Sequence, residues 1–441
     1  MNRLLIAGTN SGCGKTTVTC AILAALKARG IMPTAFKCGP DYIDPMFHRA
    51  VSGVRAYNLD PFFLDGDGLR AHLASHAGTV SVIEGAMGYY DGIAPTDEAS
   101  AYTVAREARA PVILVVSARG AGSSLGAFIE GFARYRTDSH IKGVIFNDAS
   151  ESRYPDLERI AKDAGVQAYG TMPRNEEWML PSRHLGLMTA GEIENLQDKL
   201  WSLGCQAEQS LDVGGLLALA KTASNLDGNR RPQPQRAAGV RLAVAKDEAF
   251  CFLYEENLEL LRTLGCEVIF FSPLRDRSLP ANINGLYLCG GYPELYSKTL
   301  TNNHTMLKSI RQATLDGLPT IAECGGFLYL HETLDGFPMC GVIHGTAFET
   351  KRLQRFGYIT LTAGRSNLLC EAGGSIRSRE FHYWDSSLHG DGFTAQKAGR
   401  ELSYPCVHAT ETLYAGFPHL YFPANPAFAE RFVERMARYE R

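Results

Sequence analysis

Short apolar runs alternate with helix-like segments along the first half of the chain. Buried strands are predicted at residues 4–7, 80–83, 112–116 and 144–146. Helices, recognised by apolar residues three and four apart, are predicted at residues 15–29, 98–109, 124–135 and 157–164. Strands and helices in this order imply right-handed crossovers, so the first half is predicted to form a mostly parallel sheet.

The same alternation resumes in the second half, which predicts another α/β domain. Strands are expected at 241–245, 268–271, 285–288 and 320–322, and helices at 258–264 and 306–315. Between the halves, residues 193–223 have helical spacing, and residues 222–238 are polar with two prolines, as is typical of a linker. We therefore predict a domain at 1–192, a helical segment with a linker at 193–238, and a domain at 239–441.

Composition and charge narrow the class of protein. Hydrophobic residues make up 45% and charged residues 21% of the 441 positions, and the net charge is −3. These values argue against disorder and against a nucleic-acid or anionic-membrane partner. The eleven cysteines include no C-x-x-C pair, which speaks against a zinc ribbon and fits reduced thiols. Without a leader sequence or a stretch of 18 apolar residues, a cytoplasmic location and no membrane partner are expected.

A glycine-rich loop between the first strand and the first helix is predicted to bind ATP. Its residues are Gly8, Thr9, Asn10, Ser11, Gly12, Cys13, Gly14, Lys15, Thr16 and Thr17. Backbone N–H groups of such a loop converge on phosphate oxygens, while Lys15 neutralises phosphate charge and Thr16 binds Mg²⁺. The first glycine lies one residue earlier than in the standard G-x-x-x-x-G-K-[ST] spacing, and a purely structural turn is the alternative.

Carboxylates follow a second expected strand, which lies between the phosphate loop and residue 37, and the predicted strand at 80–83. Asp41 and Asp44 lie in the Pro-flanked segment 37–45, which we interpret as a loop at the crevice where ligands of open α/β sheets bind. Glu84 ends the strand at 80–83, where an acid is costly unless used, and Mg²⁺ prefers such hard oxygen ligands. Asp91 follows on a glycine-rich turn, and turn chemistry is the alternative role for all three aspartates.

A cysteine in the second half stands at a predicted strand–turn–helix corner. In segment 318–328, Cys324 occupies the apex, and Gly325 could offer its N–H to an oxyanion. Gly291, which follows another strand, is the second predicted oxyanion donor, and His419 is the candidate base for the thiol. An inert core thiol and a buried structural histidine are the alternatives.

This combination of motifs resembles the cobyrinic acid a,c-diamide synthase family over nearly the whole chain. The matching stretches are Lys37 to Pro45, Glu84 to Gly92, Leu180 to Leu187, Ala249 to Leu261, Gly290 to Glu294, Ala322 to Gly326 and Lys351 to Tyr358. The resemblance implies an N-terminal P-loop, dethiobiotin-synthetase-like domain joined to a C-terminal class I glutamine amidotransferase-like α/β domain. It also implies a corrinoid or related tetrapyrrole polycarboxylate as substrate, ATP and L-glutamine as co-substrates, and Mg²⁺.

The resemblance further implies how the residues divide the work. ATP would convert the a- and c-acetate carboxylates of cobyrinic acid into acyl phosphates, a step of cobalamin biosynthesis, and ammonia released from glutamine at the Cys324–His419 site would amidate them. Thr16, Glu84 and Asp41 are the metal candidates. The residues expected near the substrate are Asp41, Tyr42, Asp44, Asp91, Lys351, Arg352 and Arg355, with Arg183 and His184 as further cationic candidates.

Two departures from the family pattern leave alternatives open. Position 421 is Tyr421 where many class I amidotransferases have glutamate, so the group that orients His419 stays unassigned. The family's R-G-H-E-F-H stretch reads R-S-R-E-F-H at 377–382, which leaves hydrogenobyrinic acid or nickel-sirohydrochlorin as alternative substrates. Cobyric acid synthase is less favoured because segment 40–45 fits the a,c-diamide branch.

Other classes of function remain as alternatives. A partition-type P-loop switch ATPase would carry a non-catalytic C-terminal domain, and an ammonia-dependent ligase would carry a degenerate amidotransferase. The central metal, the order of the two amidations, the ammonia route and a homodimer are left open.

Overall fold

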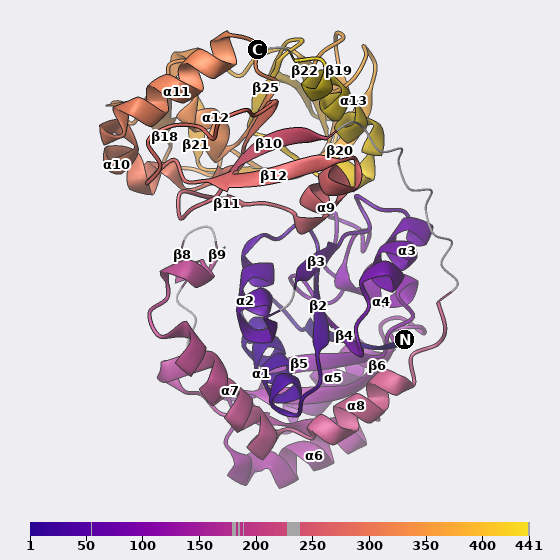
Figure 1. The fold of residues 1–441 in the computed structure, drawn as a ribbon. Coiled ribbons are helices and arrows are strands. Elements are labelled where there is room, and N and C mark those ends of the chain that lie inside the picture. Colours follow the sequence, from indigo (N-terminus) through magenta and orange to yellow (C-terminus); the bar gives the residue numbers. More distant parts are fainter. Residues whose placement is uncertain (54, 179–181, 184–185, 188, 227–238, 440–441) are drawn as a thin grey trace. The chain divides into compact units, whose positions relative to one another are not determined.

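The computed structural model describes residues 1–53, 55–178, 182–183, 186–187, 189–226 and 239–439, and for 182–183 and 186–187 it describes the backbone alone. The chain divides into two compact units, Met1–Arg231 and Pro232–Arg441 (Figure 1). His184 and the side chain of Arg183, two of the predicted substrate contacts, lie outside the described part.

Unit 1 is built around a parallel sheet of seven strands in the order β3-β2-β4-β1-β5-β6-β7. The strands are β1 Asn2–Gly8, β2 Pro33–Cys38, β3 Ala56–Leu59, β4 Val80–Glu84, β5 Val112–Ser117, β6 Ile141–Asn147 and β7 Gln167–Met172. Their apolar residues are almost all buried, because helices cover both faces of such a sheet. The four strands predicted in the first half are therefore confirmed, and β2, β3 and β7 complete the sheet.

Helices connect and cover these strands. They are α1 Lys15–Ala28, α2 Ile43–Ser52, α3 Gly66–His76, α4 Ala101–Glu107, α5 Ser124–Arg134, α6 Tyr154–Asp163, α7 Leu196–Ser210 and α8 Val213–Lys221. Short 3-10 turns occur at η1 Glu151–Arg153, η2 Glu176–Trp178 and η3 Ala190–Glu192, and β8 Ser182–Arg183 pairs with β9 Gly186–Leu187. The helical segment predicted at 193–223 is in fact two helices, because the chain is extended at Leu211 and Asp212 caps α8.

The first of these two helices, α7, packs against α1. A Cβ atom on Gly204 would lie 2.8 Å from the Cβ atom of Ala24, so the missing side chain allows the two helices to approach closely. Leu203 of α7 is fully buried, and the Arg29 guanidinium donates to both oxygens of Glu208 at 2.7 Å. This packing places α7 within unit 1.

Unit 2 contains a six-stranded sheet in the order β12-β10-β13-β15-β25-β24, in which only β24 runs antiparallel to its neighbour. Its strands are β10 Val240–Ala245, β12 Cys266–Phe271, β13 Gly285–Leu288, β15 Thr320–Glu323, β24 His408–Ala409 and β25 Leu413–Gly416. The helices are α9 Glu255–Thr263, α10 Ser297–Asn302, α11 His304–Leu315, α12 Gly325–Tyr329 and α13 Pro426–Ala437, with 3-10 turns η4 Pro293–Tyr296 and η5 Phe422–Ala424. The strands and helices predicted for this half are confirmed.

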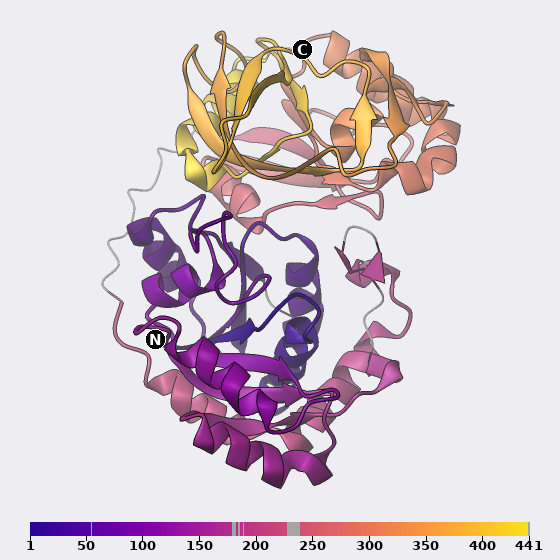
Figure 2. The same ribbon diagram turned by 180° about the vertical axis from the view of Figure 1, so that it is seen from behind.

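Further sheets in unit 2 were not predicted. One has the order β23-β22-β19-β20-β26 and another the order β17-β16-β18-β21, while β11 pairs with β14. Many of these strands, coloured orange to yellow, face the viewer in Figure 2. Their bounds are β11 Phe250–Phe252, β14 Gly290–Gly291, β16 His331–Leu334, β17 Phe337–Pro338, β18 Ile343–Glu349, β19 Arg355–Ala363, β20 Ser375–His382, β21 Trp384–Ser386, β22 Phe393–Lys397, β23 Ser403–Cys406 and β26 His419–Leu420.

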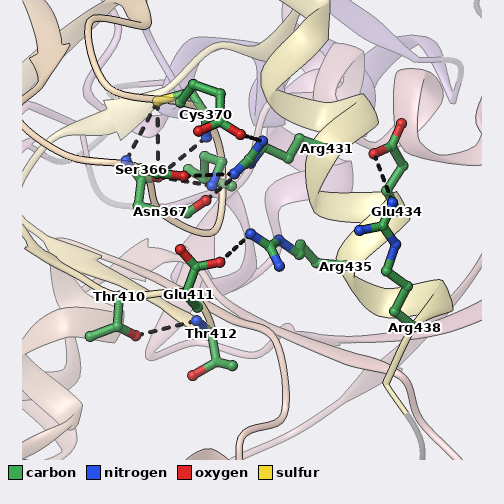
Figure 3. A network of polar contacts seen from close by, with 12 residues as sticks. Ser366, Asn367, Cys370, Thr410, Glu411, Thr412, Arg431, Glu434, Arg435 and Arg438 are labelled. Carbon is green, nitrogen blue, oxygen red and sulfur yellow. Dashed lines mark hydrogen bonds and ion pairs between the residues drawn. The ribbon is translucent and has the colours of Figure 1, made fainter.

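A polar network holds α13 against the rest of unit 2 (Figure 3). The Arg431 guanidinium donates to the Asn367 carbonyl at 3.1 Å and to the Ser366 hydroxyl at 3.0 Å. One turn further along the helix, Arg435 pairs with Glu411. Because α13 follows β26 closely in sequence, this network anchors the chain just beyond His419.

Candidate active sites

The glycine-rich loop of unit 1 joins the end of β1 to the start of α1. Gly14, the residue before the helix, has φ 98°, a left-handed conformation that favours glycine. A Cβ atom there would collide with the side chain of Asn147, whose amide nitrogen donates to the Cys13 carbonyl at 3.1 Å. Asn147, at the end of β6, therefore fixes the shape of the loop, while Ser11 and Gly12 remain exposed at its tip.

Lys15 is folded back over this loop. Its Nζ donates to the Asn10 carbonyl at 2.9 Å, and the side chain is buried. Burial lowers the pKa of Lys15, so an ammonium group here gains from an anionic partner. Together with the N–H groups at the start of α1, Lys15 makes the loop suited to bind phosphate.

Glu84, the last residue of β4, is fully buried and accepts hydrogen bonds from three side chains. The Thr16 hydroxyl and Lys37 Nζ approach Oε1 at 2.7 and 2.9 Å, and His48 Nε2 lies 2.6 Å from Oε2. Burial alone would raise the pKa of Glu84, but Lys37 and His48 outweigh burial and hold this pKa well below its usual range. Glu84 is therefore a carboxylate, joined directly to the phosphate loop through Thr16.

Lys37 bridges two carboxyl groups of this cluster. Its Nζ lies 2.6 Å from Asp44 Oδ2 and also donates to the Gly85 carbonyl at 3.0 Å. Burial would lower the pKa of Lys37, but Asp44 and Glu84 raise it well above its usual value, so Lys37 stays charged. Burial raises the pKa of Asp44 to about 8, although Lys37 opposes this shift.

Lys37 and His48 are the site residues that sequence reasoning missed. Lys37 is a buried cation in strand β2, and His48 lies one helical turn after Asp44 on α2. The local signal for Lys37 is a cation directly after two apolar residues, which the loop interpretation of residues 37–45 did not take into account. Their contacts with Glu84 span 47 and 36 positions in sequence, so local spacing does not predict them.

Asp41 and Asp91 organise the backbone near this cluster. Asp41 Oδ1 accepts the N–H groups of Ile43 at 2.8 Å and Asp44 at 3.2 Å and so caps the start of α2. The loop interpretation of residues 37–45 is therefore wrong at both ends of the segment. Lys37 and Cys38 belong to β2, and helix α2 begins at Ile43. Asp91 Oδ2 accepts the Gly88 N–H at 2.8 Å, closing the turn after β4. Tyr42 is buried beside Asp41.

The donor set of this cluster fits a magnesium ion bound together with nucleotide. Mg²⁺ takes one or two protein oxygens and fills its other positions with water and phosphate. The Thr16 hydroxyl and the Glu84 carboxylate, 2.7 Å apart, are two such oxygens beside the phosphate loop. Within the described residues no group of three or more His, Cys, Asp or Glu side chains could hold a metal alone, so the phosphates would have to complete the site.

Cys324 of unit 2 stands at a sharp corner between β15 and α12. Its φ of 45° and ψ of −102° are strained for a residue with a side chain, as is common where structure serves chemistry. The corner is tied to the sheet by the Cys324 N–H, which donates to the Gly416 carbonyl of β25 at 2.8 Å. The predicted strand–turn–helix corner is confirmed.

The predicted oxyanion donors and the predicted base lie around the same backbone segment, β14. A Cβ atom on Gly325 would lie 2.9 Å from the Gly291 nitrogen, so the backbones of these two glycines adjoin. A Cβ atom on Gly290 would collide with the imidazole of His419, which is buried at the start of β26. The structure thus brings Cys324, its neighbour Gly325, Gly291 and His419 into one cluster.

Cys324 and His419, the candidate nucleophile and base, are both buried, and burial favours the uncharged form of each side chain. Burial raises the pKa of the Cys324 thiol to about 12, with a smaller contribution from Glu294. Burial lowers the pKa of His419 to about 3, helped by Arg379 and His382. A neutral imidazole can accept the thiol proton, which is the condition for a general base.

The cationic residues predicted to bind substrate differ in their surroundings. Lys351 and Arg352 are exposed just before β19. Arg355 opens β19, and its guanidinium lies 3.5 Å from the centre of the Tyr404 ring. All three belong to unit 2, whereas Asp41, Tyr42, Asp44 and Asp91 belong to unit 1.

Comparison with known families divides the chain in the same order. Residues 4–187 match the CobQ/CobB/MinD/ParA nucleotide binding domain, and residues 241–426 match the CobB/CobQ-like glutamine amidotransferase domain. The protein therefore belongs to the class in which a P-loop nucleotide-binding domain is joined to a glutamine amidotransferase domain. The predicted fold class is confirmed.

Full-length relatives give the family. The chain is 38% identical to a cobyrinate a,c-diamide synthase from Clostridium acetobutylicum, over 98% of this chain and 100% of that one. It is 38% identical to that of Caldanaerobacter subterraneus (99% of each chain) and 36% identical to that of Thermoplasma volcanium (100% of this chain, 98% of that one). The chain belongs to the cobyrinate a,c-diamide synthase family, as its motifs predicted. None of the helices in the described ranges is long and apolar enough to cross a membrane.

Proposed function

We propose that this protein amidates the a- and c-acetate carboxylates of cobyrinic acid with ATP and glutamine. The observation that carries the proposal is the presence of two separate reactive clusters in one chain. One joins a phosphate loop to a buried carboxylate through Thr16 and Glu84, and the other places Cys324 and His419 around β14. Amide formation from a carboxylate needs both activities, because the carboxylate must be activated and nitrogen must be supplied.

Unit 1 would activate the carboxylate. The γ-phosphoryl group of ATP passes to a carboxylate oxygen of the substrate, which gives an acyl phosphate and ADP. Lys15 and the N-terminus of α1 hold the phosphates, and Lys37 and Lys15 balance the charge of the transferring group. When bound at Thr16 and Glu84, Mg²⁺ would neutralise further phosphate charge.

Unit 2 would release ammonia from glutamine. Cys324 gives its proton to His419, and its sulfur attacks the carboxamide carbon while the N–H groups of Gly291 and Gly325 stabilise the oxyanion. His419 then protonates the leaving nitrogen, and water hydrolyses the thioester to glutamate. Ammonia then attacks the acyl carbon of the acyl phosphate, phosphate departs, and the amide forms.

The remaining predicted residues would bind the polycarboxylate. Lys351, Arg352 and Arg355 supply positive charge for substrate carboxylates, and we place Asp41, Tyr42, Asp44 and Asp91 near the acetate group that reacts. The full-length relatives are cobyrinate a,c-diamide synthases, which favours cobyrinic acid over hydrogenobyrinic acid and nickel-sirohydrochlorin. The amidotransferase match likewise disfavours a switch ATPase. A cytoplasmic location, the absence of a nucleic-acid partner and a homodimer stay predictions.

Mass spectrometry of the products tests this function. With glutamine, MgATP and cobyrinic acid, we expect two successive mass decreases of about one unit, each replacing OH by NH₂. Cys324→Ser should lose glutamine-driven amidation but keep amidation driven by ammonium chloride, while Cys205→Ser, a half-buried thiol of α7, should behave as wild type. Release of glutamate by Cys324→Ser at the wild-type rate would refute the assignment of the nucleophile.

A further inference from the structure

Glu323, the residue before the nucleophile, has a fully buried side chain at the end of β15. Its Oε1 accepts the N–H of Leu420 at 3.0 Å, and its Oε2 accepts the hydroxyl of Tyr287 at 3.0 Å. The same Oε2 lies 3.8 Å from Nδ1 of His419, within the range of an ion pair. One carboxyl group therefore connects β13, β15 and β26 and faces the imidazole of the predicted base.

A carboxylate in this place has a defined effect on a histidine base. It favours the tautomer with the proton on Nδ1, which leaves Nε2 free to take a proton from a thiol. It also stabilises the imidazolium that forms once the proton has moved. The distance of 3.8 Å is longer than a hydrogen bond, but such contacts are often long without substrate and shorten in the complex.

The position that carries this acid in many class I amidotransferases holds Tyr421 here, which is buried and supplies no carboxylate. We propose that Glu323 replaces it as the positioning residue of the glutamine-hydrolysing site, orienting His419 and stabilising its imidazolium while Cys324 attacks glutamine. The inference rests on the proposed function, because it gives a role to Glu323 only if Cys324 and His419 hydrolyse glutamine. In this arrangement the acid, Glu323, is the last residue of β15, and the nucleophile, Cys324, is the next residue in the chain.

The charges around the site give the proposal a pH dependence. Burial raises the pKa of Glu323 to about 8, opposed by the Leu420 N–H and the Tyr287 hydroxyl. Glutamine hydrolysis should therefore increase with pH as this carboxyl loses its proton. The other titratable or charged groups that face the site are Tyr287, Cys289 and Tyr414 around Glu323, Arg379 and His382 around His419, and Glu294 and Glu380 around Cys324.

The test compares Glu323→Gln with a matched variant in the full-length protein. Glu332→Gln removes the charge of another glutamate–histidine pair, in which His344 Nδ1 lies 3.0 Å from Glu332, but both side chains there are exposed. The kcat and KM of glutamate release are measured between pH 6 and 9, and ammonium-driven amidation is measured on the same preparations.

We expect Glu323→Gln to lower the kcat of glutamate release by about 10²- to 10⁴-fold with little change in KM, because the amide favours the wrong tautomer of His419. The rise of activity near pH 8 should disappear, ammonium-driven amidation should persist, and Glu332→Gln should match wild type. A Glu323→Gln variant with kcat within threefold of wild type and an unchanged pH profile would overturn the proposal.

A second variant decides the outcome if Glu323→Gln folds poorly. Glu323→Asp keeps the carboxyl group, but its side chain is shorter by one methylene, so the carboxyl group lies farther from His419. A normal melting temperature together with a reduced kcat of glutamate release supports the positioning role. A normal kcat for Glu323→Asp, whose shorter side chain does not reach His419, would overturn it. Failure of the proposed function is recognised separately, because glutamate release would then survive in Cys324→Ser.

Discussion

Replacing Lys37 by methionine would remove the cation that bridges the buried carboxyl groups of Glu84 and Asp44. Its Nζ lies 2.9 Å from Glu84 and 2.6 Å from Asp44, and the side chains of the three residues are 4%, 0% and 12% exposed. Methionine fills a similar volume without charge, so Lys37→Met isolates the electrostatic loss from a cavity. Glu84 would then keep only His48 and Thr16 as partners.

The expected cost follows from this burial. Removing one partner of a buried ion pair costs about 3–5 kcal/mol, because the other charge is left uncompensated. For a unit of this size, each kcal/mol lowers the melting temperature by about 2–4 °C, so unit 1 should melt about 6–20 °C lower at pH 7.5.

The loss of unfolding free energy caused by Lys37→Met should depend on pH. In the wild type the pKa of Glu84 is lowered by folding, so Glu84 contributes stability that is present above its unfolded pKa and is lost as the pH falls through the folded pKa. Without Lys37 the folded pKa of Glu84 rises, and the carboxyl can take up a proton at pH 5. The loss of stability caused by Lys37→Met should therefore be smaller at pH 5 than at pH 7.5.

Calorimetry at the two pH values measures this loss, and hydrogen exchange of peptides from β4 assigns it to unit 1. Lys162→Met, which removes an exposed lysine of α6, should change stability by less than about 0.5 kcal/mol. Adding Glu84→Gln to Lys37→Met should restore part of the loss. A deficit below about 1 kcal/mol at pH 7.5, or a larger one at pH 5, would refute the reasoning.

Three further predictions concern both sites. Gly14→Ala should weaken ATP binding at least about tenfold by calorimetric titration, because its Cβ would displace Asn147 and its φ of 98° disfavours alanine; wild-type affinity would contradict this. Thr16→Val should lower MgATP-dependent amidation about 10²-fold with little change in melting temperature, and unchanged turnover would exclude Thr16 from the site. The pKa values of His419 and His382, about 3 and 4, are lowered by burial, so the unfolded chain binds more protons below about pH 6.5. Unit 2 should lose stability as the pH falls from 6.5 to 4, measured by denaturant unfolding, and a flat profile would be the contrary result.

The elements that sequence predicted best are those whose burial leaves a local pattern. The strand predicted at 80–83 corresponds to β4. It could be predicted because a strand buried on both faces is mostly apolar, here with Ser81 as the exception within the range. Helix α2 was missed because Pro45 and two aspartates favour a loop, yet proline is tolerated in the first turn, where its missing N–H has no partner in the helix. The strands β19 and β20 pair antiparallel, and their buried positions alternate with more exposed ones, so they contain no continuous apolar run and were not predicted.

The candidate sites likewise contain residues that a local sequence pattern marks and residues that only long-range contacts bring together. Cys324 and the loop at 8–17 could be found because glycines at fixed spacing mark a corner or a phosphate loop. The contacts of Lys37 and His48 with Glu84 depend on the pairing of β2 with β4 and on the packing of α2, which no local pattern encodes. The sequence indicates Glu323 less clearly. Burying an acid at the end of an apolar strand costs free energy unless the acid has a partner, and this was the available indication.

The deep position of the Cys324 sulfur has a consequence for damage by oxidants. Of the eleven cysteines, nine are buried and only Cys205 and Cys251 are half-exposed. Peroxide attacks the thiolate, and a sulfur that keeps its proton offers it little to react with. We expect the idle protein to withstand peroxide and to become vulnerable only during turnover, when the sulfur is ionised, so that an excess of glutamine would hasten inactivation rather than protect.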